Sequence, residues 1–268
     1  WVALEWVRGW LFTGFGWNSL GVAFHNNLSF IQIAEYTGVA GLTFLAAFAN
    51  LILVITIRRF VSEFHLHRFR PHWDFNVTML LIAGTFIYGV RTLLQPPDPN
   101  HIPLRVAAIQ PNIPQIEKFD PQFEQKIFGH LSRLTEFALA AEPQLLLWPE
   151  AATPRGMFAD ETNFRFVRGF AARGDYNFLL GSIDIDPNRR AEFNIAALLN
   201  DRGQRIQQYR KIHLVPFGEY VPFRHSFPLF AWIVGDLVPS DFTPGDQFVV
   251  MQLSNPDVKA AALICFED

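Results

Sequence analysis

Two long apolar runs in the first hundred residues constrain the fold of this chain most strongly. Residues 33–57 contain one charged side chain, Glu35, and residues 75–94 contain one, Arg91. A helix needs about 20 predominantly apolar residues to cross the hydrocarbon core of a bilayer. Because the two runs stand in tandem and neither has a polar face, we expect two membrane helices rather than two buried helices of a soluble domain.

The predicted connector between these helices, residues 58–74, indicates their orientation. It contains four arginines against two acidic residues. Short loops rich in Lys and Arg remain cytoplasmic. Residues 1–32 and everything after residue 94 are therefore expected on the outer side of the membrane. The charged residues are Arg58, Arg59, Arg68 and Arg70 against Glu63 and Asp74.

We divide the chain into three parts. Residues 1–94 form the membrane helices and an interfacial segment, because tryptophans, which prefer the headgroup level, recur within residues 1–24. That segment is either a membrane anchor or the lining of a lipid entrance. Residues 95–103 contain four prolines in nine residues and predict a linker. Residues 104–268 form a second domain, expected to be incomplete because the chain reads as an internal fragment of a longer protein.

The pattern of residues 104–268 predicts an α/β layered domain. A strand ends at Pro111, and Asp120 followed by Pro121 is typical of a helix start. Apolar residues then recur at helical spacing as far as Phe137. A second helix is expected around 160–173, and a hairpin turn at 200–203 joins two later strands. We expect the other strands at about 144–148, 177–184, 193–200, 205–212, 247–253 and 258–265.

Composition excludes several classes of function. The net charge of −3 gives no bulk basic character of the kind that binds nucleic acid. The single cysteine, Cys265, excludes an intrachain disulfide framework and a multi-cysteine zinc site. We expect neither a metal nor a cofactor.

Three reactive side chains lie at or beside predicted strand ends and suggest an acyl-transfer site. Cys265 is the candidate nucleophile, which needs a positive charge or a base nearby to become a thiolate. Glu150 ends an apolar strand, where partial desolvation suits a carboxylate to accept the thiol proton. Lys211 would stabilise the thiolate and an oxyanion. His213 is a second candidate base, ranked below Glu150.

Two further carboxylates support this hypothesis. Glu219 lies in a turn flanked by prolines and is expected to hold the charge and position of Lys211. Glu267 is expected on the same strand face as Cys265 if the strand continues. Each residue taken singly is more commonly structural, and a lone cysteine is most often an inert buried thiol. The hypothesis therefore depends on the whole set.

These segments resemble a known family. Trp148-Pro-Glu150, Arg210-Lys211 with His213-Leu-Val-Pro-Phe-Gly-Glu219, and Ile264-Cys-Phe-Glu267 resemble the Glu-Lys-Cys motifs of the nitrilase superfamily. Residues 4–21 and 108–114 extend the resemblance, more narrowly, to its membrane-embedded apolipoprotein N-acyltransferase family.

The resemblance implies a membrane helix bundle and an αββα nitrilase-like domain on the periplasmic side of the bacterial inner membrane. It implies transfer of an acyl chain from a phospholipid donor, through a cysteine thioester, to the N-terminal α-amino group of a diacylglyceryl-modified lipoprotein. Cys265 would be the nucleophile, Glu150 the base and Lys211 the oxyanion partner. Glu219 and Glu267 would match essential carboxylates, and the Phe266 N–H would complete the oxyanion hole.

Two alternatives to this function remain open. One is a membrane-tethered amidase of the nitrilase type that acts on small C–N substrates. The other is a non-catalytic, membrane-anchored binding or scaffold domain with a degenerate site.

Overall fold

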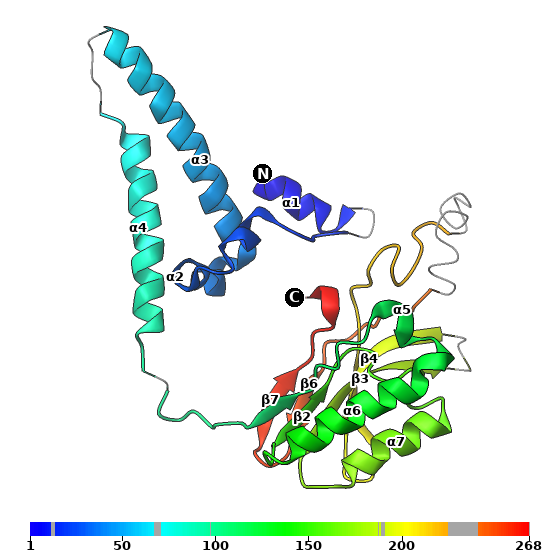
Figure 1. Ribbon diagram of the computed structural model, residues 1–268. Coiled ribbons are helices and arrows are strands. Elements are labelled where there is room, and N and C mark those ends of the chain that lie inside the picture. The colour runs from blue at the N-terminus through cyan, green and yellow to red at the C-terminus, as the bar shows by residue number, and fades with distance from the viewer. Residues whose placement is uncertain are drawn as a thin grey trace. The chain divides into compact units, whose positions relative to one another are not determined.

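The computed structural model describes residues 1–11, 14–66, 71–96, 98–186, 188, 191–224 and 241–267. The chain separates into two compact units, Trp1–His101 and Ile102–Asp268 (Figure 1). Each unit is described by itself.

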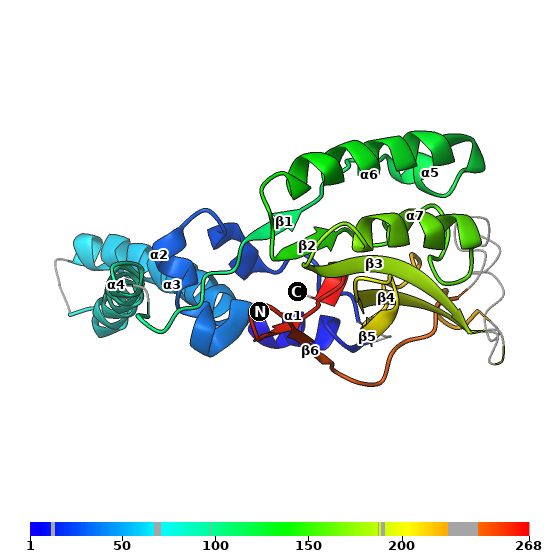
Figure 2. The same cartoon turned by 90° about the horizontal axis from the view of Figure 1, so that it is seen from below.

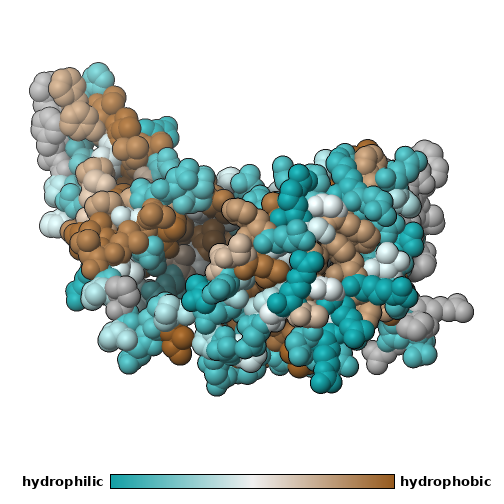
Figure 3. All heavy atoms as spheres, turned by 60° about the horizontal axis from the view of Figure 1, so that its bottom comes forward, coloured by the Kyte–Doolittle hydropathy of each residue, from teal (hydrophilic) through white to brown (hydrophobic). Residues whose placement is uncertain are grey.

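The N-terminal unit is helical. Both helices α3 and α4 are long and apolar enough to cross a membrane. Many of their large apolar side chains are exposed, including those of Leu51, Val54, Leu80 and Ile87, and hydrophobic surface covers much of these helices in Figure 3. The helices of this unit are α1 (Val2–Arg8), η2 (Leu20–Phe24), α2 (Leu28–Ile31), α3 (Ala34–Leu66) and α4 (Trp73–Leu93).

Two details depart from the sequence-based expectation. The first membrane helix was expected to end near residue 57, but α3 continues to Leu66 and includes Arg58 and Arg59. No proline or glycine interrupts residues 58–66, so nothing in the local sequence ends the helix there. Near its start α3 is kinked at Gly38, whose φ of 59° and ψ of −169° are not helical. Arg68 and Arg70 lie outside the described residues.

A glycine permits close packing within this unit. A Cβ atom on Gly89 of α4 would lie 1.7 Å from the carbonyl oxygen of Ser29 in α2. Only a residue without a side chain lets the two backbones approach this closely.

The C-terminal unit is built on a mixed sheet of five strands in the order β1-β2-β3-β4-β5. The pairs β1–β2 and β2–β3 are parallel, and β3–β4 and β4–β5 are antiparallel. This matches the expected strand-helix-strand start followed by antiparallel strands, because each parallel pair needs a crossover connection, supplied here by α6 and α7. The strands are β1 (Val106–Ala108), β2 (Leu145–Trp148), β3 (Asn177–Asp186), β4 (Ala191–Leu199) and β5 (Arg205–Arg210).

Helices cover one face of this sheet, as Figure 2 shows. Asp120 accepts a hydrogen bond from the Gln122 N–H at 2.9 Å and starts the expected helical segment. Asp160 caps α7 by accepting a hydrogen bond from the Asn163 N–H. The helical elements are α5 (Gln115–Lys118), η3 (Pro121–Phe123), α6 (Glu124–Leu139) and α7 (Glu161–Ala171), of which α5 was not expected.

The alternation of side chains along β4 separates two apolar clusters. Phe193, Ile195 and Ala197 pack into the cluster on the helical face. Ala196 and Leu198 pack into a second cluster with Met251 and Leu253 of β6 and with the neighbouring β7, as the two-residue period of a strand requires. The described layers are therefore helices, the mixed sheet, and a two-stranded antiparallel sheet of β6 (Val250–Leu253) and β7 (Val258–Ala261).

The strand expected at 258–265 is wrong at its end. β7 stops at Ala261, and Cys265 begins a 3-10 turn, η4 (Cys265–Glu267). The φ of Cys265 is 53°, in the left-handed region that an extended strand cannot contain. The Ile264 N–H donates a hydrogen bond to Glu267 Oε2 at 3.0 Å. Glu267 therefore does not share a strand face with Cys265.

Candidate functional site

Lys211 is the centre of a buried polar cluster in the C-terminal unit. It follows β5 directly, and its N–H donates to the Asn194 carbonyl of β4 at 2.8 Å. Its side chain is 1% exposed, with Nζ 2.8 Å from Glu219 Oε2 and 3.8 Å from Glu150 Oε1. A buried ammonium is tolerated where carboxylates pair with it, and here two of them do.

Glu150 enters this cluster from the end of β2. One residue, Pro149, separates it from the last residue of the strand. The neighbouring strand β3 presents Gly181, where a Cβ atom would lie 2.5 Å from the Glu150 Cα atom. Glycine at this point lets the Glu150 backbone lie against the sheet. Lys118 of α5 donates a hydrogen bond to the Glu150 carbonyl oxygen at 2.7 Å.

Glu219 is held by a tight turn. Its N–H donates to the Val215 carbonyl at 2.9 Å, and the Val215 N–H donates to Glu219 Oε2 at 2.8 Å. The Phe242 N–H donates to the Glu219 carbonyl at 2.8 Å. Several backbone contacts therefore fix the carboxylate that lies nearer to the Lys211 ammonium.

Asn194 bridges the two carboxylates, and the sequence analysis missed it. It is 5% exposed, and its Nδ2 donates to Glu150 Oε1 at 2.5 Å and to Glu219 Oε1 at 2.8 Å. The amide group of Asn194 thereby donates hydrogen bonds to both carboxylates. The available signal was a polar residue inside the apolar run Phe193-Asn-Ile195-Ala-Ala-Leu198, because a buried polar side chain needs hydrogen-bond partners.

Cys265 adjoins this cluster. Cys265 is exposed, and its thiol lies within electrostatic reach of Glu150, Lys211 and Glu219. Although the residue is exposed, partial desolvation of the thiol raises the pKa of Cys265 above its ordinary value. The negative charges of Glu150 and Glu219 raise it further, while Lys211 lowers it. The resting thiol is thus protonated at neutral pH, and forming the thiolate requires a base. That Glu150 is this base stays a prediction.

The carboxylate of Glu267 stabilises the neighbouring backbone. Its Oε1 accepts hydrogen bonds from the Tyr209 hydroxyl at 2.6 Å and from the N–H groups of Ile212 and His213 at 2.8 and 3.0 Å. Burial raises the pKa of Glu267, but these hydrogen bonds and the one from Ile264 outweigh that effect and hold the pKa below its ordinary value. Glu267 therefore links η4 to the segment after β5.

The structure thus brings Glu150, Lys211, Glu219 and Cys265 together and places Glu267 in a supporting position. Phe266 lies between Cys265 and Glu267 in η4, and the role of its N–H stays a prediction. Lys118 is a second lysine at the site that the sequence analysis missed. Among the described residues, no group of three or more His, Cys, Asp or Glu side chains is arranged to hold a metal ion.

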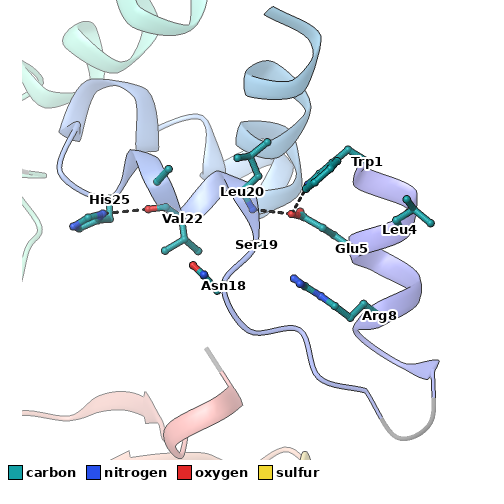
Figure 4. Close-up of a pocket in the computed structure, with 10 residues that line it drawn as sticks. Trp1, Leu4, Glu5, Arg8, Asn18, Ser19, Leu20, Val22 and His25 are labelled. Carbon is teal, nitrogen blue, oxygen red and sulfur yellow. Dashed lines mark hydrogen bonds between the residues drawn. The ribbon is translucent and has the colours of Figure 1, made fainter. Parts of the chain in front are cut away.

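A separate cavity of about 500 Å³ lies in the N-terminal unit (Figure 4). Glu5 Oε1 accepts hydrogen bonds from the Trp1 indole at 2.8 Å and from the Leu20 N–H at 2.7 Å. Glu5 Oε2 accepts one from the Thr43 hydroxyl at 2.8 Å. The carboxylate thereby ties α1 to η2 and α3, and these three hydrogen bonds all come from neutral donors.

Comparison with known proteins identifies the family. The model of the carbon-nitrogen hydrolase family matches residues 105–268, which is more than half of the chain. The chain belongs to the carbon-nitrogen hydrolase family. Its N-terminal residues 1–52 match the model of the apolipoprotein N-acyltransferase N-terminal domain. The expected combination of membrane-type helices with an α/β domain of the nitrilase type is confirmed.

Curated relatives of this carbon-nitrogen hydrolase family member extend the similarity to both units. An apolipoprotein N-acyltransferase of Geobacter metallireducens is 38% identical over 273 aligned residues, which cover 100% of this chain and 50% of that protein. One from Rickettsia bellii is 30% identical over 100% of this chain and 51% of that protein. The chain spans about half the length of the curated relatives it matches. An amidase from Nesterenkonia sp. AN1 aligns with a TM-score of 0.41, at 19% identity over 61% of this chain and 57% of that one.

Proposed function

We propose that the protein transfers an acyl chain from a phospholipid to the N-terminal α-amino group of a diacylglyceryl-modified lipoprotein cysteine, through a thioester on Cys265. The observation that carries the proposal is the buried Lys211 ammonium between Glu150 and Glu219, with the Cys265 thiol beside these charged groups. The names of the relatives and the two apolar helices support the lipid and lipoprotein substrates.

In the first step Glu150 accepts the proton of the Cys265 thiol. The thiolate attacks the ester carbonyl of the phospholipid, and the Lys211 ammonium and the Phe266 N–H stabilise the oxyanion. A C–S bond forms and the ester C–O bond breaks. The proton held by Glu150 passes to the leaving lyso-phospholipid alkoxide, which leaves an acyl thioester on Cys265.

In the second step the lipoprotein amine attacks the thioester. Glu150 accepts a proton from the amine, a C–N bond forms, and the C–S bond breaks. The proton returns to the Cys265 sulfur, and the site is restored. Exclusion of water favours transfer over hydrolysis of the thioester.

The proposed location is a bacterial inner membrane with the C-terminal unit on the periplasmic side. Arg58 and Arg59 lie in the C-terminal part of α3, near the connector to α4. Positive charge in such a short connector favours its placement on the cytoplasmic side. Arg59 forms an ion pair of 2.6 Å with Asp74, which keeps one of these charges close to the start of α4.

The test is mass spectrometry of the full-length protein mixed with phospholipid. We expect an added acyl mass on the Cys265 peptide that disappears when a diacylglyceryl lipopeptide is supplied, together with N-acylated lipopeptide. The Cys265→Ala protein, which has neither a sulfur nor a hydroxyl at this position, is the control, and an acyl mass that persists on that variant contradicts the assignment. Absence of any covalent adduct in the wild-type protein contradicts the proposal and favours a non-catalytic binding domain.

The family match supports a second candidate, hydrolysis of small C–N substrates by the same residues. A parallel incubation with short aliphatic amides separates the two. Release of ammonia from the amides without an acyl adduct from phospholipid would favour the amidase.

A further inference from the structure

Lys118 places a second positive charge at the site. It ends the short helix α5 and is half-buried. Its Nζ donates a hydrogen bond of 2.7 Å to the carbonyl oxygen of Glu150, the candidate base. Its ammonium also interacts electrostatically with the Glu150 side chain and with Cys265.

The charges of the site balance only when Lys118 is included. After Glu150 accepts the thiol proton, the Cys265 thiolate and the Glu219 carboxylate carry two negative charges. Lys211 supplies one positive charge, but its Nζ already pairs with Glu219 Oε2 at 2.8 Å. Lys118 supplies the other, so these charges cancel. The Glu267 carboxylate, which neutral donors bind, adds one negative charge beside them.

We propose that Lys118 is a positioning residue for thiolate formation: its charge stabilises the Cys265 thiolate, and its hydrogen bond fixes the backbone that carries Glu150. This inference deepens the proposed function at the same site. The charged groups that shift the pKa of the thiol are Glu150 after β2, Lys211 after β5 and Glu219 in the turn. Lys118 on α5 in turn feels the charge of Cys265. Glu267, on η4 with Cys265, is engaged by its own hydrogen bonds.

The titration of Lys118 itself agrees with this arrangement. Burial lowers the pKa of the Lys118 ammonium, and the negative charges of Glu150 and Cys265 raise it again, with burial the larger effect. By reciprocity, the ammonium that is stabilised by a thiolate also stabilises that thiolate.

The test is the pH profile of Cys265 alkylation in the full-length protein in detergent. Iodoacetamide reacts with the thiolate, and mass spectrometry of the Cys265 peptide follows the rate. Lys118→Gln keeps a donor but removes the charge, and Lys118→Arg keeps the charge. Lys126→Gln is the matched control, because Lys126 is an exposed lysine of α6 paired with Glu117.

We expect Lys118→Gln to move the midpoint of the profile upward by about 0.5–1 pH unit, which slows alkylation about 3- to 10-fold below the midpoint. Lys118→Arg and Lys126→Gln should stay within about 2-fold of the wild-type rate. An unchanged midpoint in Lys118→Gln overturns the inference, even if the variant melts at a lower temperature. A midpoint in Lys118→Arg that equals that of Lys118→Gln overturns it as well.

If Lys118→Gln fails to fold, Lys118→Met is the second neutral variant. The midpoint of its alkylation profile then tests the inference in the same way. The assay contains neither phospholipid nor lipoprotein. A shifted profile in a protein that transfers no acyl chain would therefore retain this inference and refute the proposed function.

Discussion

The two units of the molecule each gather polar groups around carboxylates, but in different ways. In the N-terminal unit, Glu5 accepts hydrogen bonds from three neutral donors, one at the start of its own helix and two on other segments of the chain. In the C-terminal unit, Glu150 and Glu219 share the buried Lys211 ammonium. Neutral donors fix the shape of a fold without creating a reactive group. A buried ammonium between two carboxylates instead places opposite charges together where water screens them little.

Removal of the buried ammonium should have the largest effect. Lys211→Met leaves Glu150 and Glu219 without their shared cation, and breaking a buried ion pair costs about 3–5 kcal/mol of folding free energy. Because Lys211 also lowers the pKa of Cys265, the variant should alkylate only at higher pH. Acyl-enzyme formation should fall about 100-fold or more, as for loss of an oxyanion donor.

The measurements for Lys211→Met are acyl mass on the Cys265 peptide, the alkylation profile and the melting temperature. Lys126→Met provides the exposed-lysine control. Acylation at the wild-type rate in Lys211→Met would show that the buried ammonium is structural only.

Neutralisation of one carboxylate should separate stability from thiol reactivity. Glu219→Gln removes the closer partner of Lys211 and should destabilise the protein by about 2–4 kcal/mol. The Glu219 charge raises the pKa of Cys265, so its loss should lower the midpoint of the alkylation profile. Acyl transfer should nevertheless decline, because the single oxygen of the new amide cannot accept from both Asn194 and the Val215 N–H, and Asn194 helps to hold Glu150.

The alkylation profile and the acyl-transfer rate of Glu219→Gln are therefore expected to move in opposite directions. If both remain at the wild-type values, Glu219 does not act on the thiol. Glu117→Gln is the matched control, since Glu117 forms an ion pair with Lys126.

Replacement of Glu267 should lower the stability of the fold by an intermediate amount that depends on pH. Its pKa is lower in the folded protein than the ordinary value of a glutamate, so it binds fewer protons when folded than when unfolded. Its contribution to stability is therefore complete above about pH 5 and is lost as the pH falls through the folded-state pKa. Glu267→Gln should lower stability by about 1–2 kcal/mol at pH 7, through weaker hydrogen bonds.

Melting curves of the wild type and Glu267→Gln over pH 3–8 check this prediction. The difference between the two melting temperatures should be constant at neutral pH and should shrink in acid. A difference that grows as the pH falls would mean that the sign of the Glu267 pKa shift is wrong.

Much of the C-terminal fold could be predicted from local patterns. Alternation and turn residues gave β3 and β4 nearly to their observed bounds, and the Asp120–Pro121 pair gave the helical start. The strand ends that carry Glu150 and Lys211 were also predictable, because polar residues follow apolar runs there.

The rest depends on contacts that a local pattern does not contain. The turn that contains the left-handed backbone of Cys265 also contains Glu267, which accepts hydrogen bonds from Tyr209 and Ile212. These two residues are more than fifty positions away in the sequence. Lys118 reaches the site only because α5 turns toward Glu150, which follows it by 32 residues. Such residues are recruited by tertiary packing, which overrides local propensity.

The smallest effect is expected where a carboxylate has neutral partners. Glu5→Gln makes the same chemical change as Glu219→Gln, but no buried ammonium loses its partner. The new NH₂ group cannot accept the hydrogen bond that Thr43 or Trp1 and Leu20 donate, so about 1 kcal/mol of stability should be lost. The midpoint of Cys265 alkylation should not move. Melting temperatures and alkylation profiles of the two variants, measured side by side, test the contrast. Equal losses of stability in both would show that the buried ammonium adds nothing to what neutral donors provide.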